Sequence, residues 1–411
     1  MGRVDEVSRL VLHNAHDGGI GQLWFFRSPR LIVFGEGALD YLKELEGKRV
    51  FIATDKTMVK LGFLKLVEDK LTAAGKEVAH YDGVLPEPPD TVVHECLALL
   101  RNFKPDIVLG LGGGSAMDVA KVARILYEYP DMPIIDITPI TTLTVKKTTL
   151  VAIPTTSGTG SDATWAAVIT NSKEHFKMEL TSTELLPFIS IVDPIFTKSL
   201  PPEVTAAPGM DALAQAIEGF TVQWRNDFSD AMSIHSIKLI LKYLPVAYSH
   251  PDDMEAREKL HNAATISGMS WSNSFLGVTH SFGHAMGALY KMPHGVAVGI
   301  VLPYSIEYSI KTSANLYGDL ARQVGVATPQ DDDKTASLKL RDVVRTLMRK
   351  MKMPLSLKEY GIPKKKFEET FDQLCRMTEE SAVNIFSCRE PTNEDIRQMW
   401  KYLYEGKSID F

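Results

Sequence analysis

Three of the chain's 11 histidines fall in one short stretch, and their spacing suits chemistry. His280 and His284 are four residues apart, so on a helix their side chains lie on the same face. His294 directly follows Pro293, a residue type at which helices end or bend. Imidazoles that converge from a helix and its exit suit either a metal ion or proton transfer to a substrate. The alternative is an amphipathic helix that carries histidines and binds no ligand.

A carboxylate at Asp211 could complete a metal site. Residues 209–219 lie at the start of the predicted helical domain, in a helix on which Asp211 and Gln215 share one face. An aspartate in an otherwise apolar helix is costly unless it is paired or bound to a metal. The alternative is a carboxylate at a helix start, which the helix dipole stabilises. Together with two of the histidines, Asp211 gives a donor set that suits Fe(II) or Zn(II) with open positions.

A glycine-rich turn is predicted to bind phosphate. A predicted strand at 106–111 is followed at once by Gly112, Gly113, Gly114 and Ser115. Glycines let backbone amides approach a phosphate closely, and the N-terminus of the next helix favours its negative charge. The spacing departs from the GxGxxG pattern, because Ser115 stands where the last glycine would be. The alternative is a tight strand–helix turn without a ligand.

Two further polar sites follow predicted strands. Asp55 comes after the strand at 49–54, where an acid can bind the ribose hydroxyls of NAD and repel the extra phosphate of NADP. A helix N-cap is the alternative for this aspartate. The strand at 149–153 is followed by a loop whose hydroxyls could hold a nucleotide or could simply be a polar loop. The hydroxyl residues singled out in that loop are Thr155, Thr156 and Thr159.

The elements that must position these residues change in type near residues 195–200. Before this point, short β-rich runs alternate with helical patterns, which predicts a parallel sheet with both faces covered. The predicted strands are 30–34, 49–54, 78–81, 106–111, 149–153 and 189–193. After Pro201 and Pro202 the pattern is helical. The predicted helices there are roughly 203–222, 229–244, 254–272, 278–290, 296–310, 312–324, 336–352, 364–380 and 393–404.

We therefore expect two domains. Residues 1–197 would form an α/β domain with a Rossmann-like parallel sheet, preceded by an arm at about 1–25, and residues 198–411 would form an all-α domain. A chain of 411 residues with 45% hydrophobic and 23% charged residues fits a globular protein of this size.

Charge and cysteine content narrow the class of protein. The net charge of −6 argues against a nucleic-acid surface. Three scattered cysteines without a CxxC pair fit a reducing cytoplasm and argue against a cysteine zinc site. Neither a signal peptide nor a membrane-spanning run is expected.

Specific motifs give the chain a resemblance to the iron-containing (group III, metal-dependent) alcohol dehydrogenase family, from Pro29 to about Trp400. The motifs are Phe34-Gly-Glu-Gly-Ala-Leu39, Thr54-Asp55-Lys56, Gly112-Gly-Gly-Ser-Ala-Met-Asp118-Val-Ala-Lys121, Pro154-Thr-Thr-Ser-Gly-Thr159, Gly209-Met-Asp211-Ala-Leu213 and His280-x3-His284-x9-His294-Gly295. The resemblance implies the dehydroquinate synthase-like fold of that family, with a dinucleotide-binding α/β domain followed by a helical domain.

The resemblance also implies a role for each matching residue. Asp211, His280 and His294 match metal ligands, and His284 matches a histidine near the nicotinamide that relays protons. Asp55 matches the acid that favours NAD over NADP.

The remaining implied contacts concern the nucleotide and the substrate. Gly112, Gly113, Gly114 and Ser115 match the pyrophosphate loop, Asp118 matches a further nucleotide contact, and Thr155, Thr156 and Thr159 match a second nucleotide loop. Trp165, Ala166 and Trp271 match positions that border the substrate pocket. Two indoles suggest an apolar pocket for a short aliphatic or an aromatic alcohol.

One residue departs from the family pattern. The family has a histidine four residues after the ligand aspartate, where this chain has Gln215. An amide oxygen is a weaker donor to Fe(II) or Zn(II) than imidazole. The site could hold its metal with Gln215 or water as fourth ligand, could hold it loosely, or could have lost metal chemistry.

The expected function is an NAD(P)-dependent alcohol dehydrogenase or aldehyde reductase with a bound Fe²⁺ or Zn²⁺. One alternative is an altered reaction, such as a hydroxyacid–oxoacid transhydrogenase or a polyol or phosphate-polyol dehydrogenase. An anionic substrate would then need a cation such as Arg225 or Lys291. A binding protein without activity is a further alternative. The expected partners are a small alcohol or aldehyde and further copies of the chain, since homodimers and larger homo-oligomers are common in the family.

Overall fold

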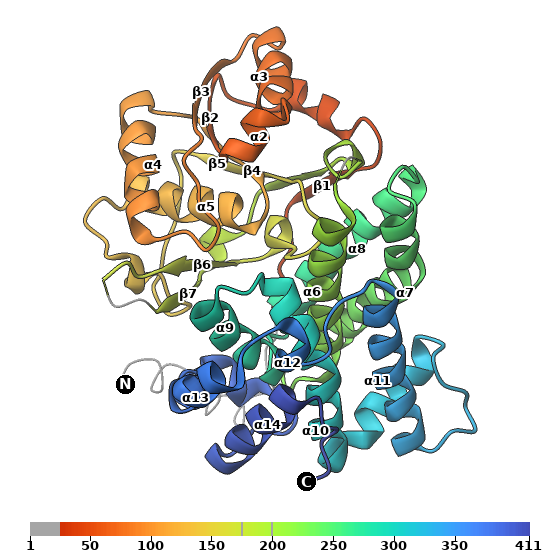
Figure 1. Cartoon of the computed structure of the whole chain (residues 1–411). Coiled ribbons are helices and arrows are strands. Elements are labelled where there is room, and N and C mark those ends of the chain that lie inside the picture. Colours follow the sequence, from red (N-terminus) through yellow and green to blue (C-terminus); the bar gives the residue numbers. More distant parts are fainter. Residues whose placement is uncertain (1–24, 174–175, 199) are drawn as a thin grey trace, which may run out of the picture. The chain divides into compact units, whose positions relative to one another are not determined.

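The protein is described by a computed structural model, which covers residues 25–173, 176–198 and 200–411 (Figure 1). The arm predicted at 1–25 lies outside the described residues, apart from Phe25. The chain forms two compact units. Of the described residues, one contains Arg27–Ala212 and Leu239–Ser272, and the other contains Phe25, Phe26, Leu213–Lys238 and Asn273–Phe411. The domain division predicted at residue 197 stays a prediction.

The first unit is built on a six-stranded sheet in the order β1-β8-β5-β4-β2-β3. All of its strand pairs are parallel, as predicted. The strands are β1 (Leu31–Phe34), β2 (Arg49–Ala53), β3 (Glu77–Tyr81), β4 (Ile107–Gly112), β5 (Thr149–Pro154) and β8 (Ile189–Val192). Strand β4 is buried along its whole length, which explains why its sequence is apolar without alternation.

Helices cover both faces of this sheet, because successive strand residues point to opposite sides. On β2, Phe51 enters a core with α4 (Asp90–Phe103) and α5 (Gly114–Glu128). Its neighbours Val50 and Ile52 enter a second core with α3 (Phe63–Ala73). The short helix α2 (Lys56–Lys60) follows β2.

An antiparallel ribbon of β6 (Ala166–Thr170) and β7 (Lys177–Thr181) was absent from the prediction. A two-stranded ribbon is only marginally stable alone. Here α5 supports it, since Asp118 accepts from the backbone N of Val168 at 2.9 Å and Lys121 donates to the backbone O of Ala166 at 2.8 Å. These contacts span some fifty residues of sequence, so local patterning did not reveal them.

Beyond Val192 the described residues form no strands, as predicted. The helices are α6 (Pro202–Thr221), α7 (Asp227–Ser249), α8 (Met254–Ser272), α9 (Val278–Tyr290), α10 (His294–Gln323), α11 (Asp333–Lys350), α12 (Leu357–Tyr360), α13 (Lys364–Glu379) and α14 (Asn393–Glu405). α8 belongs to the first compact unit, and α6 and α7 run through both. α10 joins the two helices predicted at 296–310 and 312–324, and it bends at Ser313.

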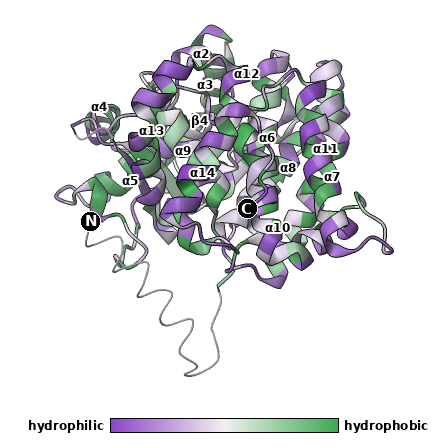
Figure 2. Ribbon diagram, turned by 60° about the horizontal axis from the view of Figure 1, so that its bottom comes forward, coloured by the Kyte–Doolittle hydropathy of each residue, from purple (hydrophilic) through white to green (hydrophobic). Residues whose placement is uncertain are grey.

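α14 shows how the sequence forms these helices. Thr392 and Asp395 form a reciprocal capping box at its start, and Gly406 ends it in the left-handed conformation. The helix carries both hydrophilic and hydrophobic residues (Figure 2), and its buried residues recur at helical spacing: Ile396, Met399, Trp400, Leu403 and Tyr404. Within the part of the chain that the structure describes, each helix is too short or too polar to cross a membrane.

Candidate active site

Helix α6 carries three buried polar side chains on one face. Asp211 is 2% exposed, and Gln215 and Glu218 are each 3% exposed. The spacings of four and three residues place all three along the same side of the helix. Polar groups at this depth require partners or a ligand, so this face of α6 marks a functional or highly constrained place.

The predicted histidines converge in the helical unit. His280 is the third residue of α9, His284 follows one turn later, and His294 is the first residue of α10 after Pro293. Their ring centroids are 6.0 Å apart for His280 and His284, 5.7 Å for His280 and His294, and 5.3 Å for His284 and His294. The short connection at Pro293 therefore returns the chain so that the imidazoles face one another.

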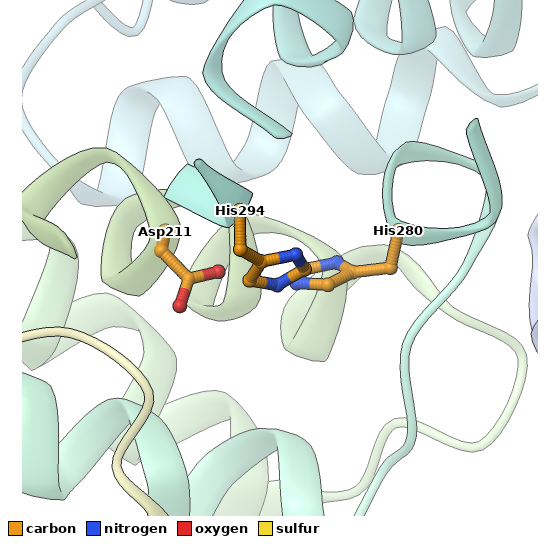
Figure 3. A group of neighbouring side chains, drawn as sticks. All are labelled: Asp211, His280 and His294. Atoms are coloured by element: carbon orange, nitrogen blue, oxygen red, sulfur yellow. The ribbon is translucent and has the colours of Figure 1, made fainter. Parts of the chain in front are cut away.

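Asp211, His280 and His294 form a group that could hold a metal ion. Each offers one ligand atom, and these atoms all lie within 4.8 Å of one another. Figure 3 shows the Asp211 carboxylate beside the ring of His294, with the ring of His280 reaching toward them from the other side. His284 is not one of the three, although its ring lies beside both histidines.

Glu218 is a site residue that the sequence analysis missed. Its Oε2 lies 2.5 Å from Nδ1 of His280, and its Oε1 accepts from the backbone N of Thr279 at 2.6 Å. Both side chains are buried. The sequence places Glu218 on the face of Asp211 and Gln215, which marks it as a candidate, but its partner His280 comes from another helix.

The backbone of the glycine turn adopts a conformation and a close packing that leave little room for a Cβ atom. Gly112 has a φ of 150°, and a Cβ there would lie 2.7 Å from Cβ of Ala116. Gly113 caps α5, and a Cβ on Gly114 would lie 3.0 Å from Cγ2 of Thr159. Gly113, Gly114 and Ser115 are half-buried, so a phosphate could reach the amides at the start of α5.

The predicted second loop lies against the glycine turn. The backbone N of Thr155 donates to the backbone O of Gly112 at 3.0 Å. Thr156 is the nearest neighbour of a Cβ built on Gly113, at 3.5 Å, and Thr159 is the nearest neighbour of Gly114. The structure therefore brings together two of the predicted nucleotide segments.

Asp55 lies beside the same turn and also caps a helix. Its Oδ1 accepts from the backbone N of Thr57 at 2.7 Å and from that of Met58 at 3.1 Å. Its Oδ2 lies 3.4 Å from the place of a Cβ on Gly112. The cap uses one oxygen and leaves the other at the glycine turn, so the two readings of Asp55 are compatible.

Asp118 has internal partners. It accepts from Oγ of Ser161 at 2.7 Å and from Val168, and Nζ of Lys121 lies 3.8 Å away. Burial raises the pKa of the Asp118 carboxyl and lowers the pKa of Lys121 to about 8. Its predicted contact with a nucleotide stays a prediction.

The predicted substrate residues lie near the second loop. Nε1 of Trp271 donates to the backbone O of Thr159 at 3.4 Å, and the backbone N of Trp165 donates to Oγ of Ser272 at 3.4 Å. Ala166 begins β6. Their contact with a substrate stays a prediction.

The cations suggested for an anionic substrate receive little support. Arg225 is ion-paired with Asp230 and stacks on Phe220, with its guanidinium carbon 4.1 Å from the ring centroid. Lys291 is the exposed C-cap residue of α9.

Comparison with known proteins places both parts of the chain in one family. Residues 29–194 match the family model described as iron-containing alcohol dehydrogenase. Residues 205–404 match the model described as the C-terminal part of the Fe-containing alcohol dehydrogenase family. The chain is 35% identical to the NADPH-dependent butanol dehydrogenase of Clostridium saccharobutylicum, over 94% of this chain and 99% of that protein.

Similar solved structures are enzymes that act on alcohols or aldehydes. The chain is similar to a 1,3-propanediol oxidoreductase, with a TM-score of 0.88, 30% identity and coverage of 93% of this chain and 100% of the other. It is also similar to sulfoacetaldehyde reductase from Bifidobacterium kashiwanohense in complex with NAD⁺, with a TM-score of 0.82, 30% identity and coverage of 93% and 99%. Other relatives are longer, and the chain spans about half, 48%, of an aldehyde-alcohol dehydrogenase of Streptococcus pneumoniae.

Proposed function

Because the chain belongs to the iron-containing alcohol dehydrogenase family, we propose that it interconverts alcohols and aldehydes with a nicotinamide cofactor and a metal ion held by Asp211, His280 and His294. The observation that carries this proposal is the convergence of those three side chains, whose ligand atoms lie within 4.8 Å of one another.

The donor set fits the metal that the family name implies. One carboxylate and two imidazoles suit Fe(II) or Zn(II) and leave positions open for a substrate. Asp211 and His280 are buried, so a cation there would offset the cost of burying a carboxylate. Gln215 lies one turn from Asp211 on the same face of α6, and we propose its amide oxygen or a water as the fourth donor.

When bound, the metal supplies a Lewis acid that polarises the substrate oxygen, and the nicotinamide supplies or accepts the hydride. The chain's own residues bind and orient. The amides of Gly112 to Ser115 would hold the pyrophosphate at the start of α5, beside Thr155, Thr156 and Thr159. His284, half-buried one turn after His280, would pass the alcohol proton toward solvent.

We propose NAD as the preferred cofactor. Oδ2 of Asp55 lies next to the glycine turn, where a carboxylate favours ribose hydroxyls and repels a 2′-phosphate. The named relatives include both an NADPH-dependent enzyme and one solved with NAD⁺, so the support comes from Asp55 itself.

For the substrate we propose a short aliphatic or an aromatic alcohol and its aldehyde. Trp271 donates to Thr159 of the second loop, Trp165 donates to Ser272 next to it in sequence, and the two indoles would supply apolar surface. Arg225, one of the two cations considered for a phosphate or carboxylate substrate, is paired with Asp230.

The test replaces one ligand and leaves the fold intact. His280→Ala should remove metal and turnover while NADH affinity, measured by fluorescence titration, stays near that of the wild type. The control is His235→Ala, which alters an exposed histidine of α7. Turnover that persists in His280→Ala would refute the assignment.

A further inference from the structure

We propose that Glu218 is a positioning residue that fixes the tautomer and orientation of His280, so that Nε2 of this histidine faces the metal. The inference rests on the proposed metal site and goes beyond it, because Glu218 contacts a ligand and is not one itself.

The hydrogen bonds around Glu218 determine where the imidazole proton lies. Its two carboxylate oxygens have different donors, the backbone N of Thr279 on Oε1 and Nδ1 of His280 on Oε2. An ionised carboxylate only accepts, so Nδ1 of His280 must carry the proton. The lone pair of neutral His280 then resides on Nε2, the nitrogen left to bind a metal.

The surroundings make this arrangement rigid. The side chain of Glu218 is 4% exposed and that of His280 is 1% exposed, so water does not compete for the bond. Thr279 is the second residue of α9, and its N–H has no acceptor within that helix. Glu218 therefore satisfies this N–H, is favoured by the positive end of the helix dipole, and ties α6 to the start of α9.

The space for the carboxylate depends on Gly277. A Cβ at this position would lie 3.3 Å from Oε1 of Glu218 and 2.9 Å from Oγ of Ser387. Gly277 has a φ of −140°, which any residue adopts, so the requirement is for space rather than backbone freedom. An alanine at 277 should displace the carboxylate or Ser387.

One helix would thus serve the site in two ways. α6 presents Asp211 as a direct ligand and, two turns later, Glu218 as the acceptor from a second ligand. A carboxylate on the far nitrogen of a ligating histidine raises the basicity of the ligating nitrogen. That effect would matter here, because Gln215 is a weak donor.

The first measurement determines which nitrogen of His280 is protonated in the metal-free protein. In ¹⁵N-labelled, metal-free full-length protein, two-bond ¹⁵N–¹H correlations report which nitrogen of His280 is protonated, and His280→Ala identifies the signal. We expect Nδ1–H in the wild type and loss of that single tautomer in Glu218→Gln, whose amide group cannot accept at both positions.

The second measurement is the affinity for Zn²⁺, by competition with a chromogenic chelator. Glu218→Gln should weaken it about 10- to 100-fold, and Glu218→Asp, which keeps the charge on a shorter side chain, should recover part of the loss. Gly277→Ala should also weaken the affinity for Zn²⁺, and it replaces Glu218→Gln as the test variant if Glu218→Gln does not fold.

A matched control separates positioning from simple loss of a buried carboxylate. Glu307 is buried in the same helical unit and is paired with Arg341 at 2.7 Å and Arg345 at 3.1 Å. Glu307→Gln should lower stability and leave Zn²⁺ affinity unchanged.

The proposal is overturned if folded Glu218→Gln keeps both the Nδ1–H tautomer and wild-type Zn²⁺ affinity, or if Glu307→Gln weakens Zn²⁺ equally. A wild type that binds no Zn²⁺ would instead refute the proposed metal site, and the tautomer measurement would still decide the role of Glu218.

Discussion

Asp55→Asn separates the two roles that the structure gives Asp55, the helix cap and the discrimination between cofactors. Asparagine caps helices about as well as aspartate, so the bonds from Thr57 and Met58 to Oδ1 should persist. The charge of Oδ2 beside the glycine turn is lost. We therefore expect stability to stay within about 0.5 kcal/mol of the wild type, whereas Asp55→Ala should lose about 1 kcal/mol.

The effect on cofactor choice can be estimated from the lost charge. A 2′-phosphate carries about 1.5 to 2 negative charges. At about 5 Å from a carboxylate, with an effective dielectric constant of about 40 to 80, the repulsion is about 1–3 kcal/mol. Removal of the charge should raise the preference for NADPH over NADH by roughly 10- to 100-fold.

The assay is the ratio of kcat/KM for NADPH and NADH in aldehyde reduction, together with urea unfolding of wild type, Asp55→Asn and Asp55→Ala. A ratio that does not change in Asp55→Asn, in a protein of wild-type stability, would refute the assignment of Asp55 to cofactor discrimination.

Three further predictions follow from the site. Gly112→Ala should lower the free energy of unfolding by about 2–5 kcal/mol, because Gly112 has a positive φ and a Cβ there would meet Ala116. Gly113 has a φ of −73°, so Gly113→Ala should lower it by less than about 1 kcal/mol. Equal losses in urea unfolding would contradict this account of the turn. Burial lowers the pKa of His261 to about 4, so its contribution to stability is fully present above about pH 6.5. As the pH falls from about 6.5 to 4, the free energy of unfolding should drop by about 3 kcal/mol. His261→Asn should remove most of this pH dependence when unfolding is measured across that range. Gln215→His should raise Zn²⁺ affinity in the chelator competition, and an unchanged affinity would show that residue 215 is not a donor.

The central strands of the parallel sheet were predictable because they are buried along nearly their whole length, whereas the edge strands β1 and β3 are partly exposed. Apart from Thr149, β4 and β5 consist of apolar residues and glycine without alternation, and they end at Gly112 and Pro154. The ribbon of β6 and β7 was not predictable, because the order of β6 comes from Asp118 and Lys121 on α5.

In the site too, features set by local sequence were predictable and features set by packing between distant segments were not. His280 and His284 share a face because of helical periodicity alone. Gly112 to Ser115 occupy a strand–helix turn that the three consecutive glycines indicate in the sequence. The role of Glu218 depends on how α6 packs against the start of α9, which no local pattern specifies. Asp118 accepts from Ser161 and Val168, which lie 43 and 50 residues away in sequence, so local patterning could not reveal these partners, and its contact with a nucleotide stays a prediction.

The most direct test is the metal content of protein purified without chelator, measured with NADH-linked aldehyde reduction before and after chelation. The account predicts near-stoichiometric iron or zinc per chain, and activity that disappears on chelation and returns when the metal is added back. Protein without metal whose aldehyde reduction is insensitive to chelators would contradict the central claim that Asp211, His280 and His294 hold a catalytic metal ion.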